Sequence, residues 1–201
     1  MLKLIALVGQ ILLEAFAAIV SGCSRESVKK FEMVVRRLDA VLGDARGQFY
    51  LGVFYSNGVN GVARDDEESA RWYRKAAEQG YADAQFMLGM CYILGSGVPQ
   101  DNKEAVRWYR KAAEQGHYMS QACLGTCYYR GEGVVQNYEE AVKWYCEAAK
   151  QGVAPSQDLL GDLYCRGECV VRDYGKAVEW YRKAAEQGYN SAQHKLGLRY
   201  Y

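Results

Sequence analysis

The sequence predicts an all-α fold, a solenoid of tandem helix-turn-helix repeats. Two recurring motifs carry this prediction: a Trp-Tyr pair that returns every 36 residues, and a Leu-Gly pair that keeps this step after a first interval of 37. A period of this length indicates an array in which each repeat buries its apolar face only by stacking on its neighbours. The motifs begin at Trp72, Trp108, Trp144 and Trp180, and at Leu51, Leu88, Leu124, Leu160 and Leu196.

The bulk composition fits a folded chain without a nucleic-acid partner. Half of the 201 residues are apolar, which is enough for a substantial core. The formal net charge is +1, and acidic and basic side chains are interspersed, so no field along the chain would hold a polyanion. We therefore do not expect nucleic acid as a partner.

The first half of each repeat is predicted to form a helix, called helix A below. In the repeat that starts at Ala82, Leu88 and Tyr92 share one helical face with the small Gly89. A glycine inside a helix costs about 1 kcal/mol relative to alanine. Its return in every repeat predicts that helix A packs against a neighbour too closely for a Cβ atom.

The second half of each repeat is predicted to form helix B, after a glycine-rich turn such as Gly95-Ser96-Gly97-Val98. Its apolar residues recur at helical spacing, and Gly116 ends it. Capping boxes that satisfy its first free amides are predicted for Asp65 with Glu68, Asp101 with Glu104, and Asn137 with Glu140.

The whole repeat, written A-x-x-x-L-G-x-x-Y-x-x-G-x-G-V, then D, then A-x-x-W-Y-x-x-A-A-x-x-G, resembles the Sel1-like repeat, a relative of the tetratricopeptide repeat. The match spans residues 45–201. The resemblance implies an α/α superhelical solenoid of antiparallel helix pairs whose helices A line a concave groove for proteins or peptides. The sequence departs from the pattern at Gly58-Val59-Asn60-Gly61, where a residue is added, and at Cys169, where the second turn glycine is lost.

The repeat register predicts the domain organisation. A leading helix B is expected in residues 23–44, where Val28, Phe31 and Val35 keep helical spacing, and a closing half repeat is expected in 190–201. The four full repeats are predicted at residues 45–81, 82–117, 118–153 and 154–189.

Residues 1–22 resemble a bacterial export signal, with Lys3 before the apolar run from Leu4 to Leu13. Cleavage is expected either at Ala15-Phe16-Ala17 or at the lipobox-like Val20-Ser21-Gly22-Cys23, where Cys23 would be lipidated. An exported chain would be periplasmic, secreted or envelope-anchored, and would touch a membrane only through this segment. The alternative is an amphipathic capping helix on a cytoplasmic protein, because Gln10 and Glu14 interrupt the apolar run.

The seven cysteines fit structural roles better than a metal site. Cys91 and Cys127 hold the repeat position of Phe54 and Leu163, which predicts small buried hydrophobes. No zinc spacing links the cysteines to either histidine, so no metal is expected. In an oxidising compartment, Cys165 and Cys169 could form a disulfide.

No catalytic motif is found in the chain. The patterns G-x-S-x-G, G-K-[ST] and H-E-x-x-H are all absent from the sequence. Gly95-Ser96-Gly97 lies between two predicted helices, with no strand before it, which makes it a turn and not a phosphate loop. We therefore predict neither an enzyme nor a cofactor.

A partner surface is predicted from the helix A residues that vary between repeats, since packing constrains the residues that recur. The surface would run from apolar and aromatic to acidic, and would suit a partner segment with hydrophobic anchors and a basic end. The alternative places Phe49, Phe86 and Ile93 in the core. The binding residues singled out are Phe49, Val53, Phe86, Met90, Ile93, Tyr129, Asp158 and Asp162, with Arg46, Ser56, Asp83, Met119, Ala122, Thr126, Pro155 and Cys165 on the same face.

Three functions are compatible with these observations. The first is a non-catalytic protein-protein interaction scaffold, or adaptor, that binds a protein or peptide in the groove formed by helices A. The second is an exported cell-envelope hydrolase or cell-wall-binding protein, suggested by residues 1–22. The third is a self-assembling structural array. The sequence favours the scaffold.

Overall fold

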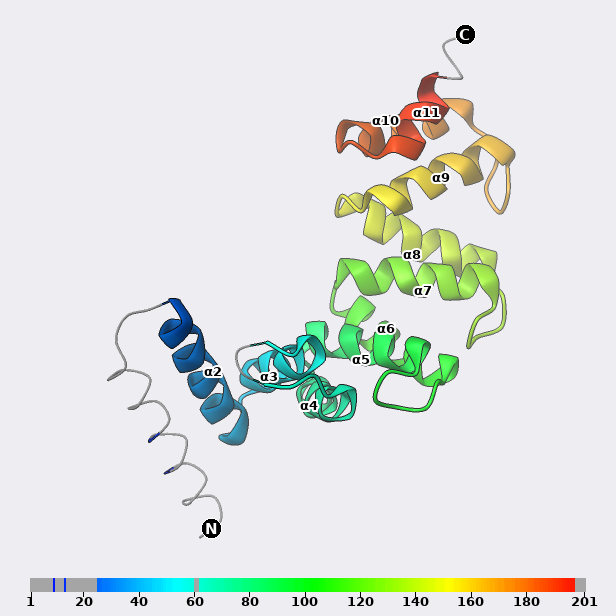
Figure 1. Cartoon of the computed structure of the whole chain (residues 1–201). Helices are drawn as coiled ribbons and strands as arrows, with labels where there is room; N and C mark the ends of the chain where they lie inside the picture. The colour runs from blue at the N-terminus through cyan, green and yellow to red at the C-terminus, as the bar shows by residue number, and fades with distance from the viewer. Residues whose placement is uncertain (1–8, 10–12, 14–24, 60–61, 198–201) are drawn as a thin grey trace. The chain divides into compact units, whose positions relative to one another are not determined.

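A computed structural model describes residues 9, 13, 25–59 and 62–197 of the chain (Figure 1). This part contains ten helices and no strand, which confirms the predicted all-α fold. The two predicted cleavage motifs and Cys23 lie outside the described residues. Within these residues, no helix combines the length and apolar character needed to cross a membrane.

The helices alternate between the two predicted types, and each full helix A or B has 13 residues. Helices A are α3 (Ala45–Asn57), α5 (Ala82–Leu94), α7 (Tyr118–Arg130), α9 (Ala154–Arg166) and the shorter α11 (Asn190–Gly197). Helices B are α4 (Asp66–Glu78), α6 (Asn102–Glu114), α8 (Tyr138–Lys150) and α10 (Tyr174–Glu186), preceded by α2 (Arg25–Val41).

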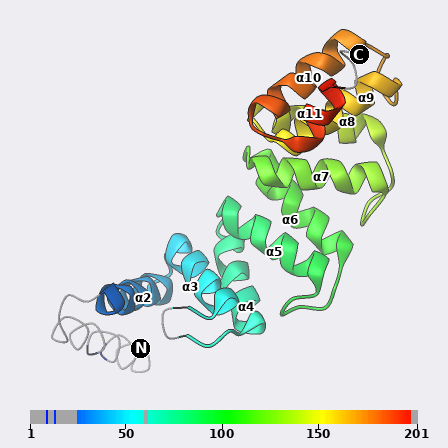
Figure 2. The same ribbon diagram turned by 45° about the horizontal axis from the view of Figure 1, so that its top comes forward.

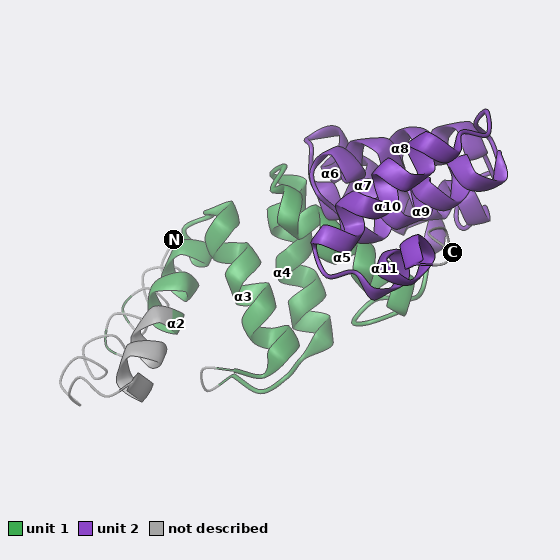
Figure 3. Cartoon of the chain, turned by 90° about the horizontal axis from the view of Figure 1, so that it is seen from above, with its two compact units in different colours: residues 1–101 green, residues 102–201 purple. Residues whose placement is uncertain are grey.

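The chain forms two compact units, residues 1–101 and 102–201 (Figure 3). The first contains α2 to α5, and the second contains α6 to α11. Within the second unit, each helix packs against the next along the chain, as the view in Figure 2 shows for α7, α8 and α9. Because successive helices of this unit are neighbours, its repeats complete their cores with side chains of the repeats beside them.

A close contact between a glycine and a tyrosine joins helix A to helix B of the same repeat. A Cβ atom built on Gly125 would lie 2.8 Å from the Tyr145 ring, and one on Gly161 would lie 2.4 Å from the Tyr181 ring. Both tyrosines are buried among alanine and leucine side chains. The prediction that helix A packs too closely for a Cβ atom is therefore confirmed in these repeats.

Of the two hydrogen bonds that define a capping box, the structure contains the one from the helix amide to the cap side chain but not the return bond, as the repeat at Asp65 shows. Asp65 accepts a hydrogen bond from the Glu68 backbone amide at 2.9 Å, but its own amide donates to the Tyr55 carbonyl at 2.9 Å. The Glu68 carboxylate pairs with Arg71 instead of returning to the cap. The prediction was wrong in this second half, because the turn brings the cap amide to a free carbonyl near the end of helix A.

Buried glutamines form a second set of contacts, which was not predicted from the sequence. The Gln121 amide nitrogen donates to the Ala113 carbonyl at 3.2 Å, and its oxygen accepts from Gln151 at 2.8 Å. Gln157 repeats both bonds with Ala149 and Gln187. These glutamines recur at the repeat period, so the spacing in the sequence could have revealed them. The same register is held by Gln48, Gln85, Gln121, Gln157 and Gln193.

The turn between α9 and α10 contains Cys169 in the left-handed region, at φ +64°. The equivalent residue of the preceding repeat is Gly133, at φ +73°. This conformation costs a residue with a Cβ atom about 1–2 kcal/mol, whereas glycine adopts it without this cost. The turn therefore keeps the left-handed conformation although the glycine is missing, and Cys169 adopts it at a cost in conformational free energy.

Replacing Gly125 with alanine is expected to lower the free energy of unfolding by about 1–2 kcal/mol, because overpacking against Tyr145 exceeds the gain in helix propensity. Gly197→Ala is the matched control, since a Cβ there meets no described atom within 4 Å. Urea denaturation checks the difference. Equal midpoints for the two variants would contradict the contact argument.

Replacing Cys169 with glycine is expected to raise the free energy of unfolding by about 0.5–1 kcal/mol, because the left-handed backbone then costs nothing beyond the entropy that glycine adds to the unfolded chain. Cys169→Ser keeps the strained Cβ and should leave the stability unchanged. Thermal unfolding followed by circular dichroism compares the two. A serine variant as stable as the glycine variant would show that the thiol, and not the backbone, is responsible.

Candidate functional site

Each compact unit has a hollow that helix A residues line, within the described part of the chain. The first, of about 210 Å³, is lined by Ser56 of α3, Tyr73 of α4, and Phe86 and Met90 of α5. We call it the α3–α5 hollow. Phe86 and Met90 were predicted to bind a partner, and they are half-buried here. The structure therefore brings these two predicted residues together at one site.

Three other predicted residues of this region do not line the α3–α5 hollow. The Phe49 ring is half-buried among aromatic rings, with centroids 5.2 Å from Tyr81 and 5.9 Å from Tyr73. Val53 and Ile93 are half-buried, and their carbonyls accept side-chain hydrogen bonds from neighbouring residues. Phe49 thus belongs to the packing between helices, as the core interpretation expected.

The second hollow, of about 350 Å³, lies among α7, α8 and α9, and we call it the α7–α9 hollow. Five residues of the predicted surface line it. Its walls include three tyrosines, of which one, Tyr129, was predicted. Tyr145 and Tyr189 were not predicted, because the prediction considered only the varying residues of helices A. Tyr145 lies on helix B of the third repeat, and Tyr189 directly precedes α11. The predicted residues are Ala122, Thr126, Tyr129, Pro155 and Asp158.

A short hydrogen-bond chain fixes the polar groups on the α8 side of this hollow. The Tyr145 hydroxyl donates to Thr126 Oγ1 at 3.1 Å, and Thr126 donates to the Ala122 carbonyl at 3.1 Å. Burial raises the pKa of Tyr145 to about 12, although the bond to Thr126 acts in the opposite direction. The tyrosine is therefore a neutral phenol near pH 7, suited to packing and hydrogen bonding.

The two predicted acidic residues are paired with a lysine of α11. Lys195 Nζ lies 2.8 Å from an oxygen of Asp158 and 2.8 Å from an oxygen of Asp162. Burial lowers the pKa of Lys195, but its bonds to the two carboxylates outweigh this and raise it. Arg166 also lies 3.5 Å from Asp162, so two cations of the chain itself pair with these two carboxylates. The surface is therefore less acidic than the sequence predicted, which weakens the reason for a basic end on the partner.

Asp158 holds an unusual position in the α7–α9 hollow. The residue is 7% exposed, and its Oδ2 accepts hydrogen bonds from Ser191 Oγ at 3.0 Å and from Lys195. Its Oδ1 is buried and has no hydrogen-bond partner among the described residues. A buried carboxylate oxygen without a donor costs free energy, so this atom needs an explanation.

The cysteines of the described chain are thiols. Cys91 and Cys127 are buried, which confirms their predicted role, and burial raises their pKa to about 11 and about 12. Cys165 and Cys169 do not form the disulfide that their spacing allowed. Cys165 lies half-buried in the last turn of α9, whereas Cys169 is exposed beyond the left-handed turn residue Gly167.

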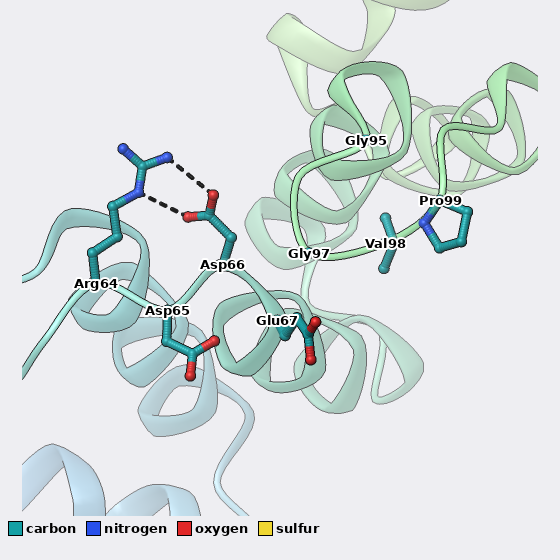
Figure 4. A pocket seen from close by; sticks show the side chains of 8 residues that line it. All are labelled: Arg64, Asp65, Asp66, Glu67, Gly95, Gly97, Val98 and Pro99. Atoms are coloured by element: carbon teal, nitrogen blue, oxygen red, sulfur yellow. Dashed lines mark hydrogen bonds and ion pairs between the residues drawn. The ribbon is translucent and has the colours of Figure 1, made fainter.

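A larger and shallower hollow, of about 790 Å³, lies where the turn after α5 meets the start of α4 (Figure 4). Arg64 forms two hydrogen bonds with Asp66, at 2.9 and 3.0 Å, which lower the pKa of that carboxyl. A Cβ on Gly97 would lie 1.9 Å from the Asp66 carbonyl oxygen. The acids here stabilise the start of a helix under a tightly stacked turn, which is a structural role.

The remaining polar groups of the second unit define what the α7–α9 hollow offers chemically. His117 caps the start of α7 by accepting a hydrogen bond from the Ser120 amide at 3.2 Å, so it serves the helix. The α7–α9 hollow offers aromatic walls, a neutral phenol and one unsatisfied acceptor. Such a mixture suits an apolar side chain with a polar group.

Comparison with known proteins places this architecture in context. The model of the Sel1 repeat matches residues 45–81, 82–117, 119–153 and 154–189. A crystal structure of c5321, a protective antigen of uropathogenic Escherichia coli with an SLR fold, is 43% identical, with a TM-score of 0.81 over 84% of this chain and 36% of its own. A Sel1 repeat protein from Oxalobacter formigenes is 37% identical, with a TM-score of 0.78 over 84% of this chain and 69% of its own.

Among curated proteins, chitin synthase regulatory factor 3 of Schizosaccharomyces pombe is 37% identical over 75 residues. That match covers 37% of this chain and only 8% of the relative. The chain thus spans a small part of that protein and about a third of the E. coli antigen. The four matched repeats cover most of the chain, which therefore belongs to the Sel1 repeat family.

Proposed function

We propose that the chain is a non-catalytic scaffold that binds a protein or peptide segment on its helix A faces. Sel1 repeat proteins are generally protein-interaction scaffolds. The observation that carries the proposal here is the pair of hollows lined by helix A residues that vary between repeats. Residues that recur, such as the glycine-tyrosine contacts, hold the fold and leave these varying positions available for a partner.

The chemistry of the hollows supports binding of side chains. Phe86 and Met90 give the α3–α5 hollow an apolar wall, and methionine adapts readily to differently shaped partners. The α7–α9 hollow adds aromatic and hydrogen-bonding groups. Because Lys195 already pairs with Asp158 and Asp162, a partner needs apolar and aromatic anchors more than a strongly basic end.

Partner binding is tested by a cross-linking pull-down from the native cell with the double variant Phe86→Gln and Met90→Gln. We expect at least tenfold weaker capture of specific partners, since buried apolar anchors carry a large share of binding energy. The matched control carries Val135→Gln and Val171→Gln, two valines that are 89% exposed in turns outside the helix A faces.

Circular dichroism first establishes that both double variants are folded. Retained capture by the Phe86 and Met90 variant would exclude the α3–α5 hollow as a partner site. Equal loss in both variants would point to the turns instead.

We also propose that the chain is exported, with an N-terminal lipid anchor as one outcome. The support is sequence alone: Lys3 followed by the apolar run from Leu4 to Leu13, and the lipobox-like residues before Cys23. Fractionation of native cells should place the full chain in the envelope or outside the cell, and a chain lacking residues 1–22 in the cytoplasm. Cys23→Ser should release an anchored chain from the membrane fraction. A cytoplasmic full chain would overturn export.

A further inference from the structure

One position differs between repeats in a way that shapes the α7–α9 hollow. The residue three before the Leu-Gly glycine is a phenylalanine in the first two repeats, an alanine in the third and an aspartate in the fourth. These residues are Phe49, Phe86, Ala122 and Asp158. In every repeat the position lies on helix A, so equivalent backbone sites carry very different side chains.

The first repeat shows what fills the space at this position. The Phe49 ring packs 5.9 Å from the ring of Tyr73, the helix B tyrosine of its own repeat, and 5.2 Å from Tyr81. These centroid distances are typical of favourable aromatic pairs. An aromatic ring is thus the natural occupant of the space beside the helix B tyrosine.

In the third repeat this ring is missing. Ala122 replaces the phenylalanine, and both Ala122 and the helix B tyrosine, Tyr145, line the α7–α9 hollow of about 350 Å³. Tyr129 and Tyr189 add further aromatic walls. The hollow therefore lies where the first repeat places its own phenyl ring, and its walls suit an aromatic side chain supplied from outside the repeat.

The fourth repeat adds to the same hollow a carboxylate that lacks a hydrogen-bond donor. Asp158 lines it, and Oδ2 is satisfied by Ser191 and Lys195, whereas the buried Oδ1 has no donor. The Tyr145 hydroxyl donates to Thr126 and cannot supply this donor. Because Oδ1 is closed to solvent, an occupant has to displace a covering side chain to bring an O–H or N–H group to it. A hydrogen bond to a charged acceptor is among the stronger ones, and it would satisfy the carboxylate.

We propose that the α7–α9 hollow binds an aromatic side chain with a hydrogen-bond donor, a tyrosine or tryptophan of the partner segment, whose ring packs on Tyr145 and whose donor bonds Asp158 Oδ1. This inference rests on the proposed scaffold function and names its partner chemistry. Phenylalanine would fill the hollow but leave Asp158 unsatisfied. The occupant is thus selected both by shape and by one hydrogen bond.

The test titrates the full chain with N-acetyltyrosinamide and with N-acetylphenylalaninamide, followed by NMR chemical shifts. The tyrosine probe should bind about tenfold more tightly, as expected for one hydrogen bond to a carboxylate. Ala122→Phe should abolish binding of both probes without loss of thermal stability, because it restores the internal ring of the first repeat. Met119→Phe, on the same helix but outside the hollow's lining, should bind both probes as the native chain does.

The Asp158 contribution is tested separately. Asp158→Ala should remove the preference for tyrosine and keep the weaker phenylalanine binding. Ser191→Ala is its control, because it removes a contact of Asp158 with α11 and leaves Oδ1 as it is. Equal binding of the two probes to the native chain would overturn the hydrogen bond, and unchanged binding to Ala122→Phe would overturn the site.

Three further outcomes identify another occupant or separate the aromatic-site proposal from the scaffold proposal. If Tyr200→Ala with Tyr201→Ala raises the probe affinity markedly, a segment of this chain competes with the probes and the partner proposal falls. If Ala122→Phe loses the probes but captures the same partners in the pull-down, the hollow takes no part in partner binding, so the proposal that it holds a partner side chain is overturned and the scaffold stands. Probe binding by a chain that captures no partner would overturn the scaffold function and leave the aromatic site.

Discussion

The fold depends on one close contact, in which a helix A glycine lies against the ring of a helix B tyrosine. At Gly125 and Gly161 a Cβ atom would come within 2.8 and 2.4 Å of the rings of Tyr145 and Tyr181. The contact sets how near the two helices approach, and it buries the tyrosine among alanines. A larger residue would push the helices apart, so the remaining contacts of these repeats follow from this spacing.

Within each compact unit, polar contacts then fix the register of neighbouring helices. Buried glutamines such as Gln121 hydrogen-bond to a carbonyl at the end of the preceding helix B and to a glutamine after the next one. The amide at the start of α4 donates to the carbonyl of Tyr55 near the end of α3, which ties the turn to both helices. Because buried polar groups are costly unless paired, these bonds disfavour any slipped arrangement of the helices.

Because the recurring glycines, tyrosines and glutamines hold the fold, the varying helix A residues are available for recognition. Phe49 uses its position for internal aromatic packing, whereas Ala122 at the same position opens a hollow beside Tyr145. Asp158 at the same position is held by α11 through Ser191 and Lys195. One backbone site therefore serves packing in one repeat and forms a binding surface in another, while the fold stays the same.

The sequence by itself determined the repeat period, the alternation of helices A and B, the close approach at the glycines and the burial of Cys91 and Cys127, because these depend on positions that return with the repeat. Only the tertiary structure decided which varying residues meet. Lys195 lies 37 residues from Asp158, and its pairing there, which corrected the expected acidic surface, follows no repeated pattern. The physical reason is that periodic packing is encoded in every repeat, whereas a hollow or an ion pair depends on single side chains that differ between repeats.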